Sequence, residues 1–135
     1  MIERVQFDIL NIEADQKEKI LISLKKQKGS CHLIHESILG SGEFVKSDFF
    51  ECLKALRYFL EKFNFLICCF GCRLDVYPSQ LSRQMSGGIK AYILKLGEPA
   101  SREDLINIFW PNSEEKISTI EEQEEYYKKW INSLN

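Results

Sequence analysis

The sequence has no long apolar run, no secretory signal and only two histidines, and each shortage excludes a class of protein. No stretch approaches the roughly 18 consecutive apolar residues of a membrane-spanning helix. The first residues, Met1-Ile-Glu-Arg-Val-Gln-Phe-Asp, show no basic segment followed by an apolar core, so no secretory signal is expected. These absences favour a cytoplasmic protein without a membrane partner.

Disulfides, metal sites and redox pairs are also poorly supported. Five cysteines, an odd number with two adjacent, make a poor disulfide framework and agree with a reducing compartment. Cys69 and Cys72 form one C-x-x-C motif, and Cys31, His32 and His35 could complete a tetrahedral metal site. However, a single motif inside the most apolar run of the chain is more typical of buried thiols. We therefore expect no metal and no cofactor. A redox pair is disfavoured because no helix is expected to begin near Cys69.

No catalytic signature is complete. His32 and His35 are the only side chains of the type that most often performs general acid–base catalysis. Each is more simply interpreted as a core or surface histidine. The prediction is therefore that the protein has no catalytic residues and is not an enzyme.

The charge of the chain is unevenly distributed. The chain has 135 residues, 44% of them hydrophobic and 28% charged, which predicts one globular domain over residues 1–135. Residues 1–97 carry 14 basic and 11 acidic side chains, a balance of +3, whereas residues 98–125 carry 2 and 9, a balance of −7. Such an acidic segment disfavours nucleic acid as a direct partner and favours a basic protein surface.

Hydrophobic periodicity predicts alternating strands and helices. Strands are expected over 5–12, 65–70 and 89–96, the last two central in their sheet. Helices are expected over 16–28, 48–63, 102–110 and 120–134, with a further helical turn beginning at Ser79. Residues 31–39 fit either a short helix or a strand. The result is an α/β or α+β sandwich, with helices packed on a small mixed sheet.

Local signals support these boundaries. Ser47 is the expected N-cap of the helix 48–63, and Asn64 is the expected left-handed terminator. Ile20, Leu21 and Leu24 would form the apolar stripe of the helix 16–28. Thr119 and Glu122 have the spacing of a capping box before the last helix.

The turn-rich connection between residues 71 and 88 concentrates side chains that can bind a ligand. Two readings stay open for these residues. If the connection emerges at a sheet edge, the two arginines could grip a phosphate or carboxylate. Otherwise Arg73 pairs with Asp75 and Tyr77 packs with its hydroxyl bonded, as an internal network. The candidate ligand-binding residues are Arg73, Asp75, Tyr77, Ser79 and Arg83.

The acidic segment is the second candidate site. Carboxylates beside large aromatic residues suit the recognition of a basic cleft, because aromatic side chains anchor an interface and charge steers association. A solvated helix face is the simpler alternative. The candidate partner-binding residues are Glu114, Glu115, Glu121, Glu122, Glu124, Glu125, Trp110 and Tyr126.

Several short motifs stand out in the second half of the chain: Asp75-Val-Tyr-Pro-Ser79, Ser82-Arg83-Gln84-Met85, Gly88-Ile-Lys-Ala-Tyr92, Leu96-Gly97 and the closing Glu121-Glu-Gln-Glu-Glu-Tyr-Tyr-Lys-Lys-Trp130. They resemble segments of small bacterial immunity proteins of polymorphic toxin systems, including those of contact-dependent growth inhibition. The resemblance covers roughly half of the chain. It implies a protein that binds one cognate toxin, often a nuclease, and occludes its active site.

Three hypotheses follow. The leading one is an immunity-type inhibitor whose partner is a cognate toxin domain. The alternative is a small enzyme or ligand-binding module that holds an anionic metabolite through the loop from Arg73 to Arg83. The third is a homo-oligomeric structural module, since the many aromatic residues could serve an interface as well as a core.

Overall fold

The computed structural model describes residues 2–135, which form two antiparallel sheets and three α-helices. The larger sheet has the order β4-β3-β2-β1-β5 and the smaller the order β6-β7-β8. The expected α+β class is confirmed, with antiparallel rather than mixed pairing. The strands are β1 (Ile2–Asn11), β2 (Gln16–Gln27), β3 (Ser30–Ser37), β4 (Gly40–Lys46), β5 (Phe65–Ile67), β6 (Val76–Tyr77), β7 (Lys90–Ile93) and β8 (Leu105–Asn107). The helices are α1 (Phe49–Glu61), α2 (Gln80–Met85), α3 (Ile120–Ser133) and the short 3₁₀ helices η1 (Phe70–Cys72) and η2 (Arg102–Asp104).

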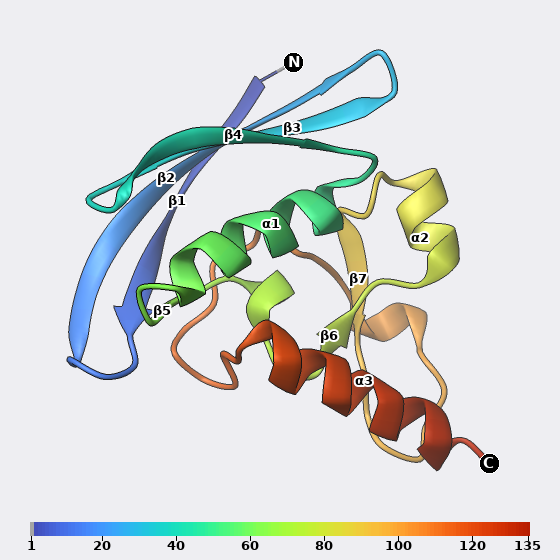
Figure 1. Ribbon diagram of the computed structural model, residues 1–135. Helices are drawn as coiled ribbons and strands as arrows, with labels where there is room; N and C mark the ends of the chain where they lie inside the picture. The colour runs from blue at the N-terminus through green and yellow to red at the C-terminus, as the bar shows by residue number, and fades with distance from the viewer. Residues whose placement is uncertain (1) are drawn as a thin grey trace.

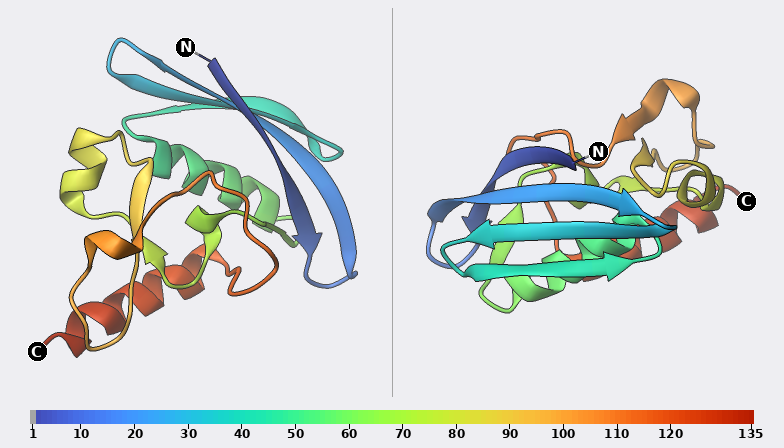
Figure 2. Two further views of the ribbon diagram at one scale, coloured as in Figure 1. Left: turned by 180° about the vertical axis from the view of Figure 1, so that it is seen from behind. Right: turned by 90° about the horizontal axis from the view of Figure 1, so that it is seen from above.

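Helix α1 is the centre of the molecule. The larger sheet curls over one side of it, and α3 lies on the other side with the small sheet (Figures 1 and 2). Leu53, Leu56 and Leu60 of α1 are fully buried in the same core as the inward side chains of β1, β2 and β3. Burying such a side chain contributes about 2 kcal/mol. The sheet therefore stabilises α1, and α1 in turn supports α3.

The prediction of a helix over residues 16–28 is wrong, because this segment forms β2. Ile20, Ile22 and Leu24 are buried at every second position, which is the period of a strand. Lys28 and Gly29 have φ angles of 49° and 80° and form the two-residue turn into β3. Such a turn suits a hairpin, since its twist matches that of the flanking strands. The undecided segment 31–39 falls largely in β3.

Helix α1 is confirmed with a different cap. Asp48, not Ser47, occupies the N-cap, and its side chain accepts a hydrogen bond from the backbone N–H of Glu51 at 2.8 Å. Asn64 has a φ of 65° and ends the helical segment in the left-handed region, as expected.

Two expectations on the second half of the chain are wrong. The apolar run from residue 65 yields only the three-residue edge strand β5, while β7 is the middle strand of the other sheet. The helix expected over 102–110 is η2 followed by β8, in which Ile106 pairs with Ala91 and is nearly buried. The turn at Ser79 and the last helix are confirmed as α2 and α3. None of the helices in residues 2–135 combines the length and apolar character of a membrane crossing.

His35 is a buried polar residue of the larger sheet, and one of its ring nitrogens has no hydrogen-bond partner among residues 2–135. Only 3% of it is exposed, and its ring stacks between Phe44 and Phe59 at centroid distances of 5.6 and 5.3 Å. No hydrogen-bond partner for Nδ1 is found among the described residues. Burial lowers the pKa of His35, because the charged imidazolium cannot be solvated there.

Stability should therefore fall as the pH drops below about 6.5, the ordinary pKa of histidine. In that range the unfolded chain binds a proton at this position and the folded chain does not, so protons favour unfolding. Urea unfolding of the wild type and of His35→Leu between pH 7 and pH 5 measures the effect, which the variant should lose. His32→Gln is the matched control and should retain it. Equal pH dependence in wild type and His35→Leu would contradict the prediction.

Candidate functional site

A buried hydrogen-bond hub fixes α3 against α1. Arg57 is only 2% exposed and donates from Nη1 to Oε1 of Gln123 at 2.7 Å and from Nη2 to the carbonyl of Ser118 at 3.0 Å. Nε2 of Gln123 lies 2.8 to 2.9 Å from the carbonyl oxygens of Gly71, Arg73 and Val76. One side chain of α3 therefore binds α1, η1 and the start of β6 together.

The N-terminus of α3 is a complete capping box, as predicted. The Thr119 hydroxyl accepts from the backbone N–H of Glu122 at 3.2 Å, and Oε1 of Glu122 accepts from the backbone N–H of Thr119 at 2.8 Å. Glu61 of α1 adds an acceptor for the backbone N–H of Ile120 at 3.1 Å. Glu122 is therefore exposed but also has a structural role.

The six candidate glutamates do not form one surface. Glu114 and Glu115 are exposed in the loop before α3, where Glu114 pairs with Lys17 at 3.2 Å. Glu124 faces the interior of the fold. Only Glu121, Glu122 and Glu125 share the outward side of α3. The structure thus divides the set into a loop pair, an outward trio and one internal residue.

Glu124 belongs to an internal network. It accepts from Nζ of Lys54 at 2.9 Å and from the hydroxyl of Tyr77 at 3.1 Å. Burial alone would raise the pKa of Glu124, but the bond and charge of Lys54 outweigh it and hold that pKa below its ordinary value. Burial, with Glu124 beside the hydroxyl, raises the pKa of Tyr77 to about 12. Glu124 is therefore an anion that joins α3 to α1 and β6.

We call Glu121, Glu122, Glu125 and Tyr126 the acidic face of α3. Three of these residues, Glu122, Glu125 and Tyr126, line an open depression of about 190 Å³ together with Leu74 and Lys129. The Tyr126 hydroxyl is anchored by donation to the carbonyl of Leu94 at 3.0 Å. The acidic face therefore presents exposed carboxylates around a fixed aromatic ring.

The loop before α3 runs antiparallel to residues 68–74. Backbone hydrogen bonds join Phe70 N–H to the carbonyl of Trp110 at 2.9 Å and Leu74 N–H to the carbonyl of Lys116 at 2.7 Å. Trp110 is half exposed and its ring packs edge-on against Phe70. Trp110, Glu114 and Glu115 are thus held on a segment that is pinned to η1, and Leu74 links that segment to the acidic face.

Arg73 and Asp75 form the internal pair that was one of the two readings of the loop. The Arg73 guanidinium donates twice to the Asp75 carboxylate, each bond being 2.9 Å, and Lys116 lies 3.4 Å from the same carboxylate. Burial would raise the pKa of Asp75, but Arg73 and Lys116 outweigh it and lower that pKa. Arg73, Asp75 and Lys116 line one side of an open groove of about 480 Å³, which Lys95, Asp104 and Tyr126 also line.

Arg83 lies in a different network from Arg73. It pairs with Glu51 at 3.0 Å and Asp48 at 3.7 Å near the start of α1, and its guanidinium lies 4.9 Å from the ring centroid of Phe50. Ser79 is occupied as the N-cap of α2. The two arginines therefore do not converge on one site, and the small-ligand alternative loses that geometric support.

The histidine and cysteine residues considered for a metal also separate. His32 lies on the outer face of the larger sheet, beside Glu43 at 3.1 Å, whereas His35 lies on the inner face. Among residues 2–135 no three His, Cys, Asp or Glu side chains are placed to hold a metal ion together.

Cys69 and Cys72 are fully buried thiols, with their sulfur atoms 3.3 Å apart. A short 3₁₀ helix does begin beside Cys69, contrary to expectation. Burial raises the pKa of Cys69. It would also raise that of Cys72, but the hydrogen bond from Cys69 and the charge of Arg57 outweigh it and lower the pKa of Cys72.

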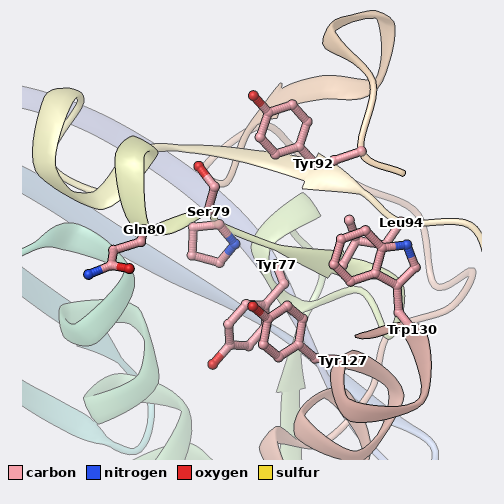
Figure 3. Close-up of a pocket in the computed structure, with 9 residues that line it drawn as sticks. Tyr77, Ser79, Gln80, Tyr92, Leu94, Tyr127 and Trp130 are labelled. Atoms are coloured by element: carbon pink, nitrogen blue, oxygen red, sulfur yellow. The ribbon is translucent and has the colours of Figure 1, made fainter. Parts of the chain in front are cut away.

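An aromatic recess that the sequence did not predict lies beside the C-terminal half of α3 (Figure 3). Its volume is about 170 Å³. Two features of the sequence could have indicated this recess. They are the pair Tyr127 and Trp130, three residues apart on a helix, and the Tyr-Pro dipeptide at residue 77. The lining residues are Tyr77, Pro78, Ser79, Gln80, Tyr92, Leu94, Ala100, Tyr127 and Trp130.

No protein-family model matches the chain, and no curated protein matches it. The argument for function therefore depends on the acidic face of α3, the loop before it and the aromatic recess.

Replacing Gln123 should be among the most damaging single changes in the molecule. Gln123→Met keeps the length of the side chain but leaves Arg57 and several carbonyl groups without their partner, which should cost about 3 kcal/mol. Urea unfolding measures the loss. Gln80→Met, at an exposed position on α2, is the matched control and should change stability by less than about 0.5 kcal/mol. A similarly small change for Gln123→Met would contradict the hub.

Adjacent glutamates on α3 should behave differently. Glu124→Ala removes the partner of Lys54 and of the Tyr77 hydroxyl and should lower the free energy of unfolding by about 2 kcal/mol. Glu125→Ala, at an exposed position, should change it by less than about 0.5 kcal/mol. Thermal and urea unfolding of the two variants provide the comparison, and equal losses would contradict the assignment of Glu124 to the interior.

Proposed function

We propose that this protein is an immunity-type inhibitor that binds the cognate toxin domain through the acidic face of α3 and occludes the toxin's active site. The observation that carries the proposal is the pairing of Glu122 and Glu125 with the anchored ring of Tyr126 around one open depression. Exposed carboxylates steer a basic partner, and a fixed aromatic ring supplies contact area at low entropic cost.

The internal assignments support binding rather than turnover. The candidate ligand-binding residues of the 73–83 loop are already occupied by internal contacts: Arg73 with Asp75, Tyr77 with Glu124, Arg83 with Glu51, and Ser79 as the N-cap of α2. These contacts make the loop a scaffold for α3. The glutamates of the acidic face remain available for a partner, and they lie on the segment whose charge balance is −7.

The loop residues extend the proposed interface. Glu114, Glu115 and Trp110 are exposed on the segment that runs along η1 and leads into α3. Lys129 lines the same depression and, with the exposed Lys128, places positive charge at the C-terminal end of the interface. A basic active-site cleft would therefore be expected to meet the N-terminal half of α3.

The test is co-expression in a bacterial host with the toxin domain encoded beside this chain, followed by stopped-flow binding of the purified pair. The chain should relieve growth arrest. Glu121→Lys with Glu125→Lys should lower the association rate constant about tenfold at low salt, and by less at high salt. Both positions are exposed and neither belongs to the capping box.

Glu36→Lys is the matched control, since Glu36 is exposed on β3, on the far side of the molecule from α3. It should leave the rate constant unchanged. No growth relief by the wild type would refute the inhibitor, whereas relief with a rate constant indifferent to Glu121 and Glu125 would move the interface away from the acidic face.

A further inference from the structure

The aromatic recess borders the internal network of Glu124 through Tyr77, but the open space itself is not part of that network. It opens between the C-terminal half of α3, the strands β6 and β7, and the beginning of α2 (Figure 3). Most of its lining is apolar or aromatic, with Ser79 and Gln80 as the polar side chains at one end. A recess of this kind on a binding surface is where a single anchoring side chain of a partner inserts.

Three rings form one wall as a stacked series. Tyr77 and Tyr127 stack at a centroid distance of 3.9 Å with an interplanar angle of 13°, and Tyr127 and Trp130 follow at 6.0 Å and 19°. Trp130 is held by donation from Nε1 to the carbonyl of Glu98 at 2.9 Å. The wall is therefore fixed before any ligand arrives, which lowers the entropic cost of binding.

The electrostatics of this wall favour a cation. Ring faces carry a negative quadrupole and attract guanidinium and ammonium groups. Behind the stack, the Glu124 carboxylate is bonded to the hydroxyl of Tyr77 and paired with Lys54. With Asp48 and Glu51 counted, three carboxylates there face two cations, Lys54 and Arg83. The fold itself already places a guanidinium on this system, because Arg83 lies 5.8 Å from the ring centroid of Tyr77. Glu51 and Asp48 neutralise that internal arginine.

The lining of the recess favours an arginine side chain over a lysine side chain. Pro78, Leu94 and Ala100 offer apolar contact to a methylene stem, while the planar guanidinium can stack on the rings and is weakly hydrated. The compact ammonium of lysine is more strongly hydrated and gains less from such a site.

We propose that the recess receives an arginine side chain of the protein partner. The assignment rests on the proposed function for the existence of that partner, but the chemistry of the recess can be tested without it. Arginine in the recess and basic residues on the acidic face would engage two parts of the same helix. The partner would then hold the C-terminal half of α3 as well as its first turns.

The test uses small probes on the full chain. In ¹⁵N NMR titrations, N-acetyl-arginine amide should shift the indole N–H signal of Trp130 in a saturable way. N-acetyl-lysine amide should bind more weakly, and the leucine and proline amides weakest of all. If the leucine or proline amide binds as tightly as the arginine amide, the proposal is overturned in favour of an apolar anchor. The lack of a saturable shift with any probe would also overturn the proposal.

Variants show whether binding is in the recess. Tyr127→Leu keeps an apolar wall but removes a ring and should weaken arginine amide about tenfold, the loss expected of one partly desolvated cation–π contact. Tyr92→Ala alters the opposite wall and should also weaken it, while Tyr58→Leu, at an exposed tyrosine of α1, should not. Thermal melts select the variants that are folded. Unchanged affinity in folded Tyr127→Leu and Tyr92→Ala would overturn the assignment.

The two proposals fail in different experiments. If the chain relieves no toxin but arginine amide binds at Trp130, the inhibitor is refuted and the recess is retained as a site for arginine side chains. If the toxin is bound with normal affinity by folded Tyr127→Leu, the recess has no part in the complex even though the inhibitor stands.

Discussion

The buried guanidinium of Arg57 is the constraint on which the arrangement of the functional surfaces depends. A charged group with 2% of its surface exposed must be compensated inside the protein, and here the compensation comes almost entirely from the far end of the chain. Gln123 and the carbonyl of Ser118 satisfy it, with Glu61 at 4.0 Å. Because a buried arginine without these acceptors would be strongly unfavourable, α3 can dock in only one orientation.

That single orientation separates the charges of α3 into two classes. With Gln123 facing inward, Glu124 falls at the edge of the interface, where Lys54 and Tyr77 bind it. Glu121 and Glu125, one turn apart, face outward. The charge balance of a segment therefore overstates the negative charge that a partner would meet, because a carboxylate can be paired inside the fold. The same orientation turns Tyr127 and Trp130 toward the recess and Tyr126 toward Leu94, whose carbonyl accepts the hydrogen bond of its hydroxyl.

The sequence was informative where local signals were strong. The capping box at Thr119 and the apolar stripe of residues 49–60 predicted α3 and α1, because caps and the helical period are local properties. The segment 16–27 was mistaken for a helix because Ile20, Leu21 and Leu24 satisfy a helical period while Ile20, Ile22 and Leu24 satisfy a strand period equally well. Only the pairing with β1 and β3 decides between them, and pairing is not a local property.

The candidate sites show the same division between local and non-local information. The pair of Arg73 and Asp75, two residues apart, was one of two readings of the loop, and the structure shows it. The inward position of Glu124 depends on Lys54, seventy residues away, and could not be read from the neighbouring glutamates. The recess likewise joins Tyr77 to Tyr127 across fifty residues. Hydrophobic patterning signals that an aromatic residue will be buried, but not which other aromatic residue it will stack against.

The acidic face lies on the N-terminal half of α3 and the recess on its C-terminal half, so a partner would meet both along one helix. Charge on an exposed helix acts over a Debye length and mainly accelerates encounter, whereas a preformed recess acts only at contact and mainly slows dissociation. A helix that carries both can attract many basic surfaces but retain only one that also presents a suitable side chain at the right distance. Specificity would then come from the fixed spacing between Tyr126 and Trp130, which lie one turn apart on α3 and are each anchored by a hydrogen bond.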